Sequence, residues 1–363
     1  MDTPTFSVKG TPTALLSSPQ GELWTLTQEG RIYINNALFL DISNRLPKLR
    51  PFYDERGLLA LAFSPTRPNV YYIYYTTAGS DKANLLTGRS RRVTPIPTNW
   101  NEARSVGVNV IEEWEGQQFR RRLLAVRWPT LIHNGKDCLT FAPDGRLLWA
   151  SGDGGGAYDP LNLASSDAHV HGKIIALNVN TQQQQERNIA RVQELPPYAQ
   201  VLSKGLRNPV AFDYTDNTYY LTVAGEHRYE WAFAFPNLPR DFGWRRFEGI
   251  EPVARYQSET TALAPPYLPL TYYRHNDPTF TGFTGIVITS GRGYKRKFFF
   301  LDWQKGLFVV APNFANLQQF ATPVAVKGEN PTLATHTALA RHAGGLWAAG
   351  TKDGRGFVYR ALL

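Results

Sequence analysis

The sequence predicts an all-β fold, a six-bladed β-propeller of four-stranded antiparallel blades. Three observations lead to this prediction: the composition, a repeated hairpin pattern, and strand-like segments at both ends of the chain. Among 363 residues, 30 are glycine and 25 are proline, 13% are aromatic, and only 19% are charged. Frequent turn residues combined with many aromatic residues favour strands over helices.

One pattern recurs along the chain: a small or polar residue, a turn of Asp, Gly or Asn, and an alternating aromatic strand that ends in small residues. It is found at 17–34, 63–77, 141–155 and 212–226, and more loosely at 294–310 and 341–359. Each copy predicts a β-hairpin, because the turn residues allow a tight bend and the period-two alternation gives each strand one buried face. Six copies in 363 residues leave about 60 residues per unit, which suffices for a four-stranded blade.

The two chain ends favour a closed ring, which removes long exposed sheet edges. "GELWTLTQEGRIYI" near the start and "GFVYRALL" at the end are both strand-like, so we expect the termini to meet. Helix signals are few, and the segments 41–49 and 180–195 predict short turns at most. We expect one domain over 1–363. On pattern alone, a pair of β-sandwiches and a seven-bladed ring stay open as alternatives.

Charge and cysteine content bear on partners and location. The net charge is +9, with basic clusters at 89–92, 120–122 and 295–297. No nucleic-acid motif accompanies them, so we expect a solvated basic face and no nucleic-acid partner. No apolar run approaches about 18 residues, which predicts no membrane span. The first residues lack the features of a signal peptide, and the single cysteine, Cys138, excludes an intrachain disulfide. Together these features favour the cytoplasm or an assembled particle over classical secretion.

Five motifs in order resemble the soluble glucose/sorbosone dehydrogenases, a family of pyrroloquinoline quinone-dependent aldose sugar dehydrogenase-like β-propellers. They are "DERGLLALAFSP" (54–65), "HNGKDCLTFAPDGRLLWASGDGG" (133–155), "DPLNLASSDAHVHGKIIALN" (159–178), "GLRNPVAFDY" (205–214) and "AGEHRYEWAFAFPNLPRDFGWRRFEG" (224–249). Weaker similarity continues into the last blade. The resemblance implies a six-bladed propeller that oxidises a sugar hydroxyl by hydride transfer to the quinone.

The resemblance also assigns roles to individual residues. His133 opens the "HNGK" motif and takes the place of the catalytic base, a role that suits imidazole because its ordinary pKa is about 6.5. Arg207 and Asn208 correspond to a pair beside the quinone, where the arginine stabilises negative charge and the asparagine orients the cofactor. Glu55 takes the place of a residue that contacts substrate or cofactor. From the residues alone, ordinary turns, or a pairing of Glu55 with Arg56, are equally consistent.

Cofactor binding is where the sequence departs from the family. The family holds calcium over the quinone with a Gly-Pro or Gly-Gln loop, and "AGEHRYEW" stands here instead, so Glu226 and Glu230 are the candidate oxygen ligands. The lysine and the Arg-x-Arg pair that meet the quinone's carboxylates align with Asn313, Ala334 and His336. Each lost charge-assisted hydrogen bond should cost about 1.5–3 kcal/mol of binding free energy.

Two functions are therefore consistent with the sequence. In the first, the protein is a quinoprotein sugar dehydrogenase that uses pyrroloquinoline quinone and calcium, with a small sugar as substrate. In the second, the propeller has lost its cofactor and serves as a structural or binding module with a protein or glycan partner or through self-assembly, since fold alone does not fix function.

Overall fold

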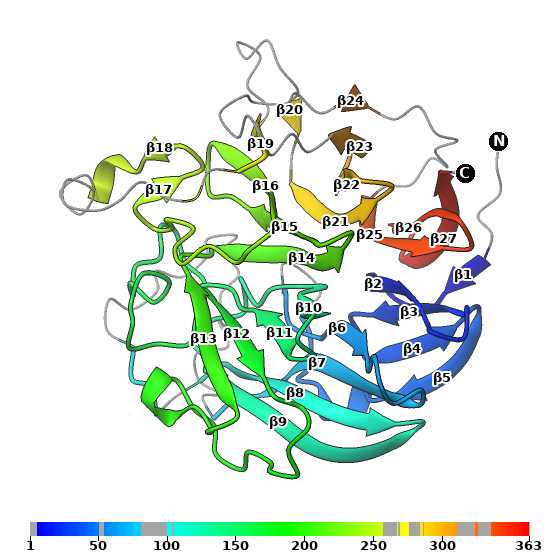
Figure 1. Cartoon of the computed structure of the whole chain (residues 1–363), viewed down its shortest axis with the longest axis horizontal. Helices are drawn as coiled ribbons and strands as arrows, with labels where there is room; N and C mark the ends of the chain where they lie inside the picture. Colours follow the sequence, from blue (N-terminus) through cyan, green and yellow to red (C-terminus); the bar gives the residue numbers. More distant parts are fainter. Residues whose placement is uncertain are drawn as a thin grey trace.

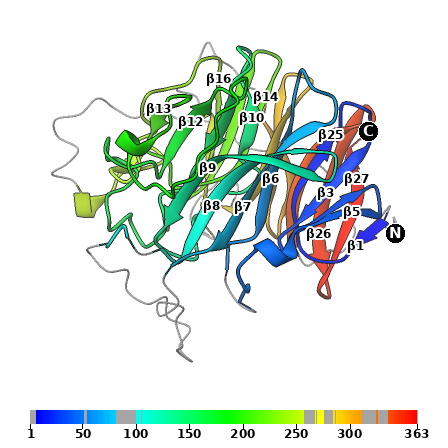
Figure 2. The ribbon, with the colours of Figure 1, turned by 90° about the horizontal axis from the view of Figure 1, so that it is seen from below.

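The computed structural model confirms the six-bladed propeller: six sheets of four or five strands are arranged in a ring, and the described residues also form one small two-stranded sheet (Figure 1). The structure describes residues 6–50, 54–80, 100–103, 105–256, 267, 269–275, 284–285, 287–310, 324–325 and 335–362. The first strands of the sheets contact one another around the ring, which makes them the inner strands: β2, β6, β10, β14, β21 and β25. Seen from below, the sheets follow one another across the disc (Figure 2).

The first three blades each consist of four strands that are consecutive in sequence. Blade 1 comprises β2 (Pro12–Ser17), β3 (Leu23–Thr27), β4 (Arg31–Ile34) and β5 (Ala37–Asp41). Blade 2 comprises β6 (Leu58–Phe63), β7 (Val70–Ala78), β8 (Gly107–Glu115) and β9 (Gln118–Trp128). Blade 3 comprises β10 (Leu139–Phe141), β11 (Leu147–Ala150), β12 (Lys173–Leu177) and β13 (Ala199–Lys204).

The remaining blades are less regular. Blade 4 comprises β14 (Asn208–Thr215), β15 (Thr218–Ala224), β16 (Tyr229–Phe235), β19 (Thr271–His275) and β20 (Thr284–Gly285), which runs parallel to β19. Blade 5 comprises β21 (Ile288–Tyr294), β22 (Lys297–Asp302), β23 (Gly306–Val310) and β24 (Val324–Ala325). Blade 6 comprises β25 (Thr335–His342), β26 (Gly345–Lys352), β27 (Arg355–Leu362) and the N-terminal β1 (Phe6–Val8).

The termini close the ring, as predicted. Strand β1 pairs antiparallel with β27, with Phe6 opposite Val358 and Val8 opposite Gly356. The N-terminal strand is thus the outermost strand of the last blade. A ring closed in this way joins its first and last blades through backbone hydrogen bonds as well as side-chain packing.

An insertion in blade 4 bears on the site. Between β16 and β19 the chain forms a small hairpin of β17 (Phe247–Glu248) and β18 (Glu251–Pro252), followed by the 3₁₀ helix η3 (Ala254–Tyr256). The other helical turns in the described part are η1 (Ser43–Arg45) and η2 (Val192–Glu194), as expected for the segments 41–49 and 180–195. No helix within the described ranges is long and apolar enough to cross a membrane.

Alternating aromatic residues explain how the blades pack. In β7, Tyr71 belongs to the hydrophobic cluster shared with blade 1, whereas Tyr72 and Tyr74 belong to the cluster shared with blade 3. The Tyr74 ring lies 5.3 Å from the ring of Trp149 in blade 3. All three tyrosines are buried, because neighbouring blades cover both faces of each sheet. A strand with apolar or aromatic residues on both of its faces is therefore what a propeller blade requires.

The basic cluster at 120–122 is only partly solvated, because Arg120 is exposed whereas Arg121 is buried. Arg120, Arg121 and Arg122 on β9 lie next to β8, where they pair with Glu115, Glu113 and Glu112 respectively. Since each guanidinium has a carboxylate partner, this cluster is not a surplus of positive charge. The cluster at 89–92 lies outside the described residues.

Candidate functional site

Loops that precede the inner strands of blades 2, 3 and 4 bring three of the predicted residues together. The Glu55 carboxylate accepts hydrogen bonds through Oε2 from the backbone N–H of His133 at 2.6 Å and from Nδ2 of Asn208 at 3.1 Å. Oδ1 of Asn208 accepts in turn from the N–H of Gly135 at 3.2 Å. Residues separated by up to 153 positions thus share one hydrogen-bond network. We call the group of Glu55, His133, Asp153, Arg207 and Asn208 the central site.

His133 is held by a buried carboxylate that the sequence analysis did not assign. Its Nδ1 lies 2.7 Å from Oδ1 of Asp153, and both side chains are almost fully buried. Asp153 also accepts from the Gly155 N–H at 2.8 Å and from the indole N–H of Trp244 at 2.8 Å. Burial raises the pKa of Asp153, but the charge and hydrogen bond of His133 outweigh burial, so the net shift is downward.

This arrangement sets the chemistry of the imidazole. Because an ionised Asp153 only accepts hydrogen bonds, Nδ1 of His133 carries a proton, and in the neutral form of the imidazole the lone pair is then on Nε2. Within the described part of the chain, no protein group hydrogen-bonds to Nε2. His133 has a φ of 55°, in the left-handed region that few non-glycine residues adopt.

The glycines after β11 have a steric cause. A Cβ atom on Gly152 would lie 1.8 Å from the carbonyl oxygen of His133, so no larger residue fits. This close approach allows the next residue, Asp153, to reach the imidazole. The "GDGG" sequence was the available signal for Asp153. Clustered glycines indicate only that the backbone can adopt unusual angles there. In the structure, the main consequence of these glycines is the position of the Asp153 carboxylate.

Arg207 lies at the same centre but is engaged by the protein. Its Nε and Nη2 donate to Oε2 of Glu226 at 3.0 and 2.9 Å, and its Nη1 donates to the carbonyl of Ala224 at 3.0 Å. Its own carbonyl accepts from the N–H of Asp153 at 2.7 Å. Burial lowers the pKa of Arg207, but the charges of Glu226 and Asp153 raise it by more. The net shift is upward, so the guanidinium stays charged.

The two carboxylates predicted as calcium ligands have protein partners. Glu226 forms the ion pair with Arg207, and Glu230 accepts from the Gly225 N–H at 3.3 Å, the Ile288 N–H at 3.0 Å and Nε2 of His275. Burial raises the pKa of Glu230 despite the opposing effect of His275. Across the described ranges, no three His, Cys, Asp or Glu side chains gather in a way that could hold a metal ion. The calcium site therefore stays a prediction, and these contacts do not favour it.

Of the three positions that align with the lysine and the two arginines expected to meet the quinone's carboxylates, the structure describes one. Asn313 and Ala334 lie outside the described residues. His336 is buried on β25, where its Nδ1 lies 2.9 Å from the Tyr359 hydroxyl, and burial lowers its pKa. A neutral imidazole with a protein partner does not replace an arginine.

A tricarboxylate quinone does not fit the described residues as they stand. Glu55, Asp153 and Glu226 bring three carboxylates to the centre, and three of the five N–H donors of Arg207 are used by Glu226 and the carbonyl of Ala224. Lys136, half-buried close by, donates through Nζ to the carbonyl of Thr337 at 2.6 Å, and burial lowers its pKa to about 8. Like charges would face one another, which raises the free energy of the complex.

The fold of this chain is similar to that of several sugar dehydrogenase propellers. Its structure is similar to the PQQ-bound aldose sugar dehydrogenase of Streptomyces coelicolor, with a TM-score of 0.64 and 16% identity over 99% of this chain and 98% of that one. A putative glucose dehydrogenase of Thermus thermophilus gives 0.65 and 17%, with 99% of both chains covered. The PQQ domain of pyranose dehydrogenase from Coprinopsis cinerea gives 0.55 and 12%, over 98% and 94%. At these identities, the likeness shows a shared fold.

Sequence similarity to curated proteins is partial. HIPL1 protein of Arabidopsis thaliana is 28% identical over 198 residues, which is 48% of this chain and 28% of that protein. HIPL2 protein of the same plant is 25% identical over 181 residues, 43% of this chain and 25% of that protein. The matched segment thus spans about a quarter of the length of these relatives. No protein-family model matches the chain.

Proposed function

We propose that this propeller binds a neutral sugar at the central site and that Nε2 of His133 accepts a hydrogen bond from one sugar hydroxyl. The observation that carries the proposal is the hydrogen bond of 2.7 Å between Nδ1 of His133 and Asp153, which leaves Nε2 available as an acceptor. The fold shared with sugar dehydrogenases supports the choice of a sugar. Carboxylates around one neutralised arginine suit a neutral polyol better than an anion.

Each residue of the central site has a distinct part in this function. Asp153 fixes the tautomer of His133, and in the oxidation considered next it would also stabilise the imidazolium that forms when His133 takes up the hydroxyl proton. Glu55 accepts from the backbone N–H of His133 and so holds the loop that carries it. Asn208 donates to Glu55 and accepts from Gly135, which ties the loop of blade 4 to the loop of blade 3. These contacts preorganise the base before any ligand arrives.

Quinone-dependent oxidation of the same hydroxyl is a second candidate. The observation in its favour is that Arg207 and Asn208 lie at one centre with His133, as the family resemblance implies. This candidate requires further cations from the segments outside the described residues, because Arg207 is already paired with Glu226.

Sugar titrations with and without cofactor test the proposal. We expect glucose, or another aldose in a small panel, to shift NMR signals of the protein without quinone or metal. His133→Ala should weaken binding about two- to tenfold, the effect of losing one hydrogen bond. Asp153→Asn should act in the same direction. His342→Ala, which changes a histidine on the β25–β26 hairpin, is the matched control and should leave binding unchanged.

Addition of pyrroloquinoline quinone and calcium with a redox dye separates the two candidates. Dye reduction that depends on sugar and is lost in His133→Ala would establish the second. Sugar binding without dye reduction would establish the first alone. Absence of both would rule out the central site as a sugar site and favour a structural role for the propeller.

A further inference from the structure

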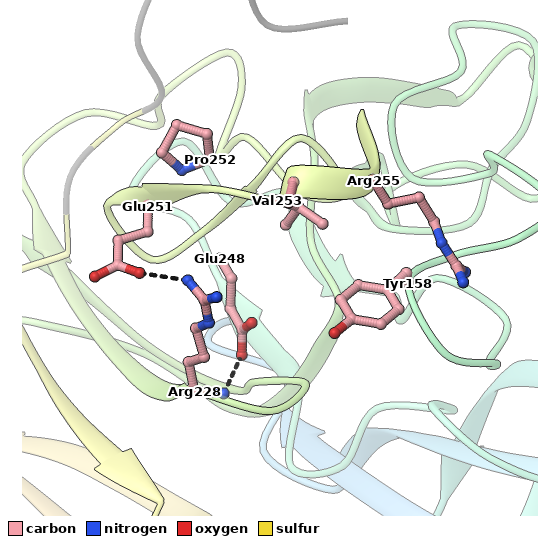
Figure 3. Close-up of a pocket in the computed structure, with 8 residues that line it drawn as sticks. Tyr158, Arg228, Glu248, Glu251, Pro252, Val253 and Arg255 are labelled. Atoms are coloured by element: carbon pink, nitrogen blue, oxygen red, sulfur yellow. Dashed lines mark hydrogen bonds and ion pairs between the residues drawn. The ribbon is translucent and has the colours of Figure 1, made fainter. Parts of the chain in front are cut away.

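A side pocket adjoins the central site. It is a cavity of about 220 Å³ between the loop of blade 3 that carries Tyr158, the start of β16, and the insertion of blade 4 (Figure 3). Its walls include Tyr158, Arg228, Glu248, Glu251, Val253 and Arg255. The volume is below the roughly 300–1,000 Å³ of pockets that take drug-sized ligands, so the pocket suits a single ring.

The Tyr158 ring forms a braced aromatic wall of this pocket. Figure 3 shows it opposite Glu248, with Arg255 on its other side, and the Arg255 guanidinium lies 5.3 Å from the ring centroid. The ring also stacks on Trp244 at a centroid distance of 6.4 Å and an interplanar angle of 22°. The carbonyl of Tyr158 accepts from the hydroxyl of Tyr256 at 2.7 Å. A half-buried ring held on several sides is a preorganised surface for the C–H face of a sugar.

Hydrogen-bond donors and acceptors stand side by side in the pocket. Nη1 of Arg228 donates to Oε2 of Glu251 at 2.6 Å. One oxygen of Glu248, Oε1, accepts from the four consecutive backbone N–H groups of residues 226–229 at 2.8–3.3 Å, which fixes this carboxylate in place. Among the described residues, its other oxygen has no hydrogen-bond donor. Sugar hydroxyls both donate and accept, so adjacent hydroxyls match such a wall.

The charge of the pocket favours a neutral ligand. Two arginines, Arg228 and Arg255, and two glutamates, Glu248 and Glu251, line it, so their formal charges cancel. An anionic ligand would meet the two carboxylates, and a cationic ligand would meet the two guanidiniums. An uncharged ring with several hydroxyls meets neither penalty and can use both kinds of group.

Tyr158 connects this pocket to the central site. Its backbone N–H donates to Oε2 of Glu226 at 3.2 Å, the same oxygen that accepts from Arg207. Its ring stacks on Trp244, whose indole N–H donates to Asp153. We infer that the side pocket binds a second glycosyl unit and that the ligand of this propeller is a neutral oligosaccharide or glycoside. This inference rests on the proposed sugar site around His133.

Paired affinities test the inference. Dissociation constants for glucose, maltose and cellobiose are measured by calorimetry or ligand-observed NMR, without quinone. We expect at least one disaccharide to bind wild-type protein about fivefold more tightly than glucose. Tyr158→Ala should abolish that advantage, while Tyr158→Phe should keep it. Arg228→Ala, which alters an exposed side chain and should not disturb folding, should reduce it.

Phe119→Ala, which removes an exposed aromatic ring on β9 away from the pocket, is the control and should keep the advantage. Equal affinities for glucose and both disaccharides in wild-type protein would overturn the subsite while leaving the central sugar site standing. Equal weakening of all three sugars by Tyr158→Ala would also overturn it. Failure of every sugar to bind would overturn the subsite together with the proposed function.

Discussion

Two groups of buried charged side chains on or beside the inner strands differ in what balances their charge. In the first, the central site, Asp153 and Glu55 accept hydrogen bonds from an imidazole, an indole, an amide and backbone N–H groups. In the second, which we call the axial ion pairs, carboxylates meet guanidiniums: Asp137 with Arg292 at 2.6 Å, and Asp213 with Arg341 at 2.9 Å.

The partners explain the different roles of the two groups. Arg292 of blade 5 reaches the loop before blade 3, and Arg341 of blade 6 reaches blade 4, so the axial ion pairs link blades that are not neighbours. A guanidinium does not release its proton at physiological pH, and these pairs therefore serve stability. An imidazole exchanges its proton near neutral pH. The positive charge of each axial ion pair is therefore fixed, whereas the central site contains an imidazole, which is the group that our proposal uses.

The largest expected effect comes from breaking an axial ion pair. Arg292→Ala leaves Asp137 buried without its guanidinium, and we expect the free energy of unfolding to fall by about 3–5 kcal/mol. Chemical denaturation measures this change. Arg120→Ala, which breaks the exposed pair with Glu115, is the control and should cost no more than about 1 kcal/mol. Equal losses in the two variants would contradict the division between fixed and exposed pairs.

A second variant converts the central site towards cofactor binding. Glu226→Gln removes the carboxylate that pairs with Arg207, so the guanidinium becomes available to an anionic ligand. We expect the affinity for pyrroloquinoline quinone to rise about tenfold or more, in line with about 1.5–3 kcal/mol for a charge-assisted hydrogen bond. Equilibrium dialysis measures it. Glu186→Gln makes the same change in net charge at an exposed position. If both variants gain the same affinity for the quinone, the change in net charge explains the gain and the release of Arg207 does not.

A smaller effect concerns pH. Asp159 is buried and accepts hydrogen bonds from the N–H groups of Leu163 and Ala164, both at 2.9 Å. Burial raises its pKa to about 7, above its usual value of about 3.9 in an unfolded chain. Between these values the folded state binds the extra proton, so this group adds stability as the pH falls from about 7 to about 4.

Asp159→Asn should remove that pH dependence, which denaturation curves of both proteins at several pH values will show. Burial lowers the pKa of His171 to about 3, which gives the opposite slope below about pH 6.5, but it does so in both proteins. The difference between them therefore isolates Asp159. Curves that stay parallel from pH 7 to pH 4 would show that its carboxyl group titrates alike in the folded and unfolded states.

The propeller was predictable because its signal is periodic. Hairpins such as 141–155 follow from turn residues and alternation, both of which are local in sequence. Closure by β1 and β27 followed from the strand-like ends. The irregular blade 4 was not predictable from this pattern, because the hairpin and helix between β16 and β19 interrupt the repeat.

For the site, the motifs indicated positions but not pairings. Resemblance placed His133, Asn208 and Glu55 together, and the structure shows them in one network. The bond from His133 to Asp153 depends on the close approach at Gly152, and the pairing of Arg207 with Glu226 depends on how a loop folds back. Such contacts join residues that lie far apart in sequence, so a local sequence pattern does not predict them.

The shared last blade has a consequence for synthesis. Strand β1 is translated before the other strands of the ring, and its partner β27 is translated after them. During translation, β1 therefore has no hydrogen-bonding partner until β27 has been made. The ring can close only after all six blades have been translated.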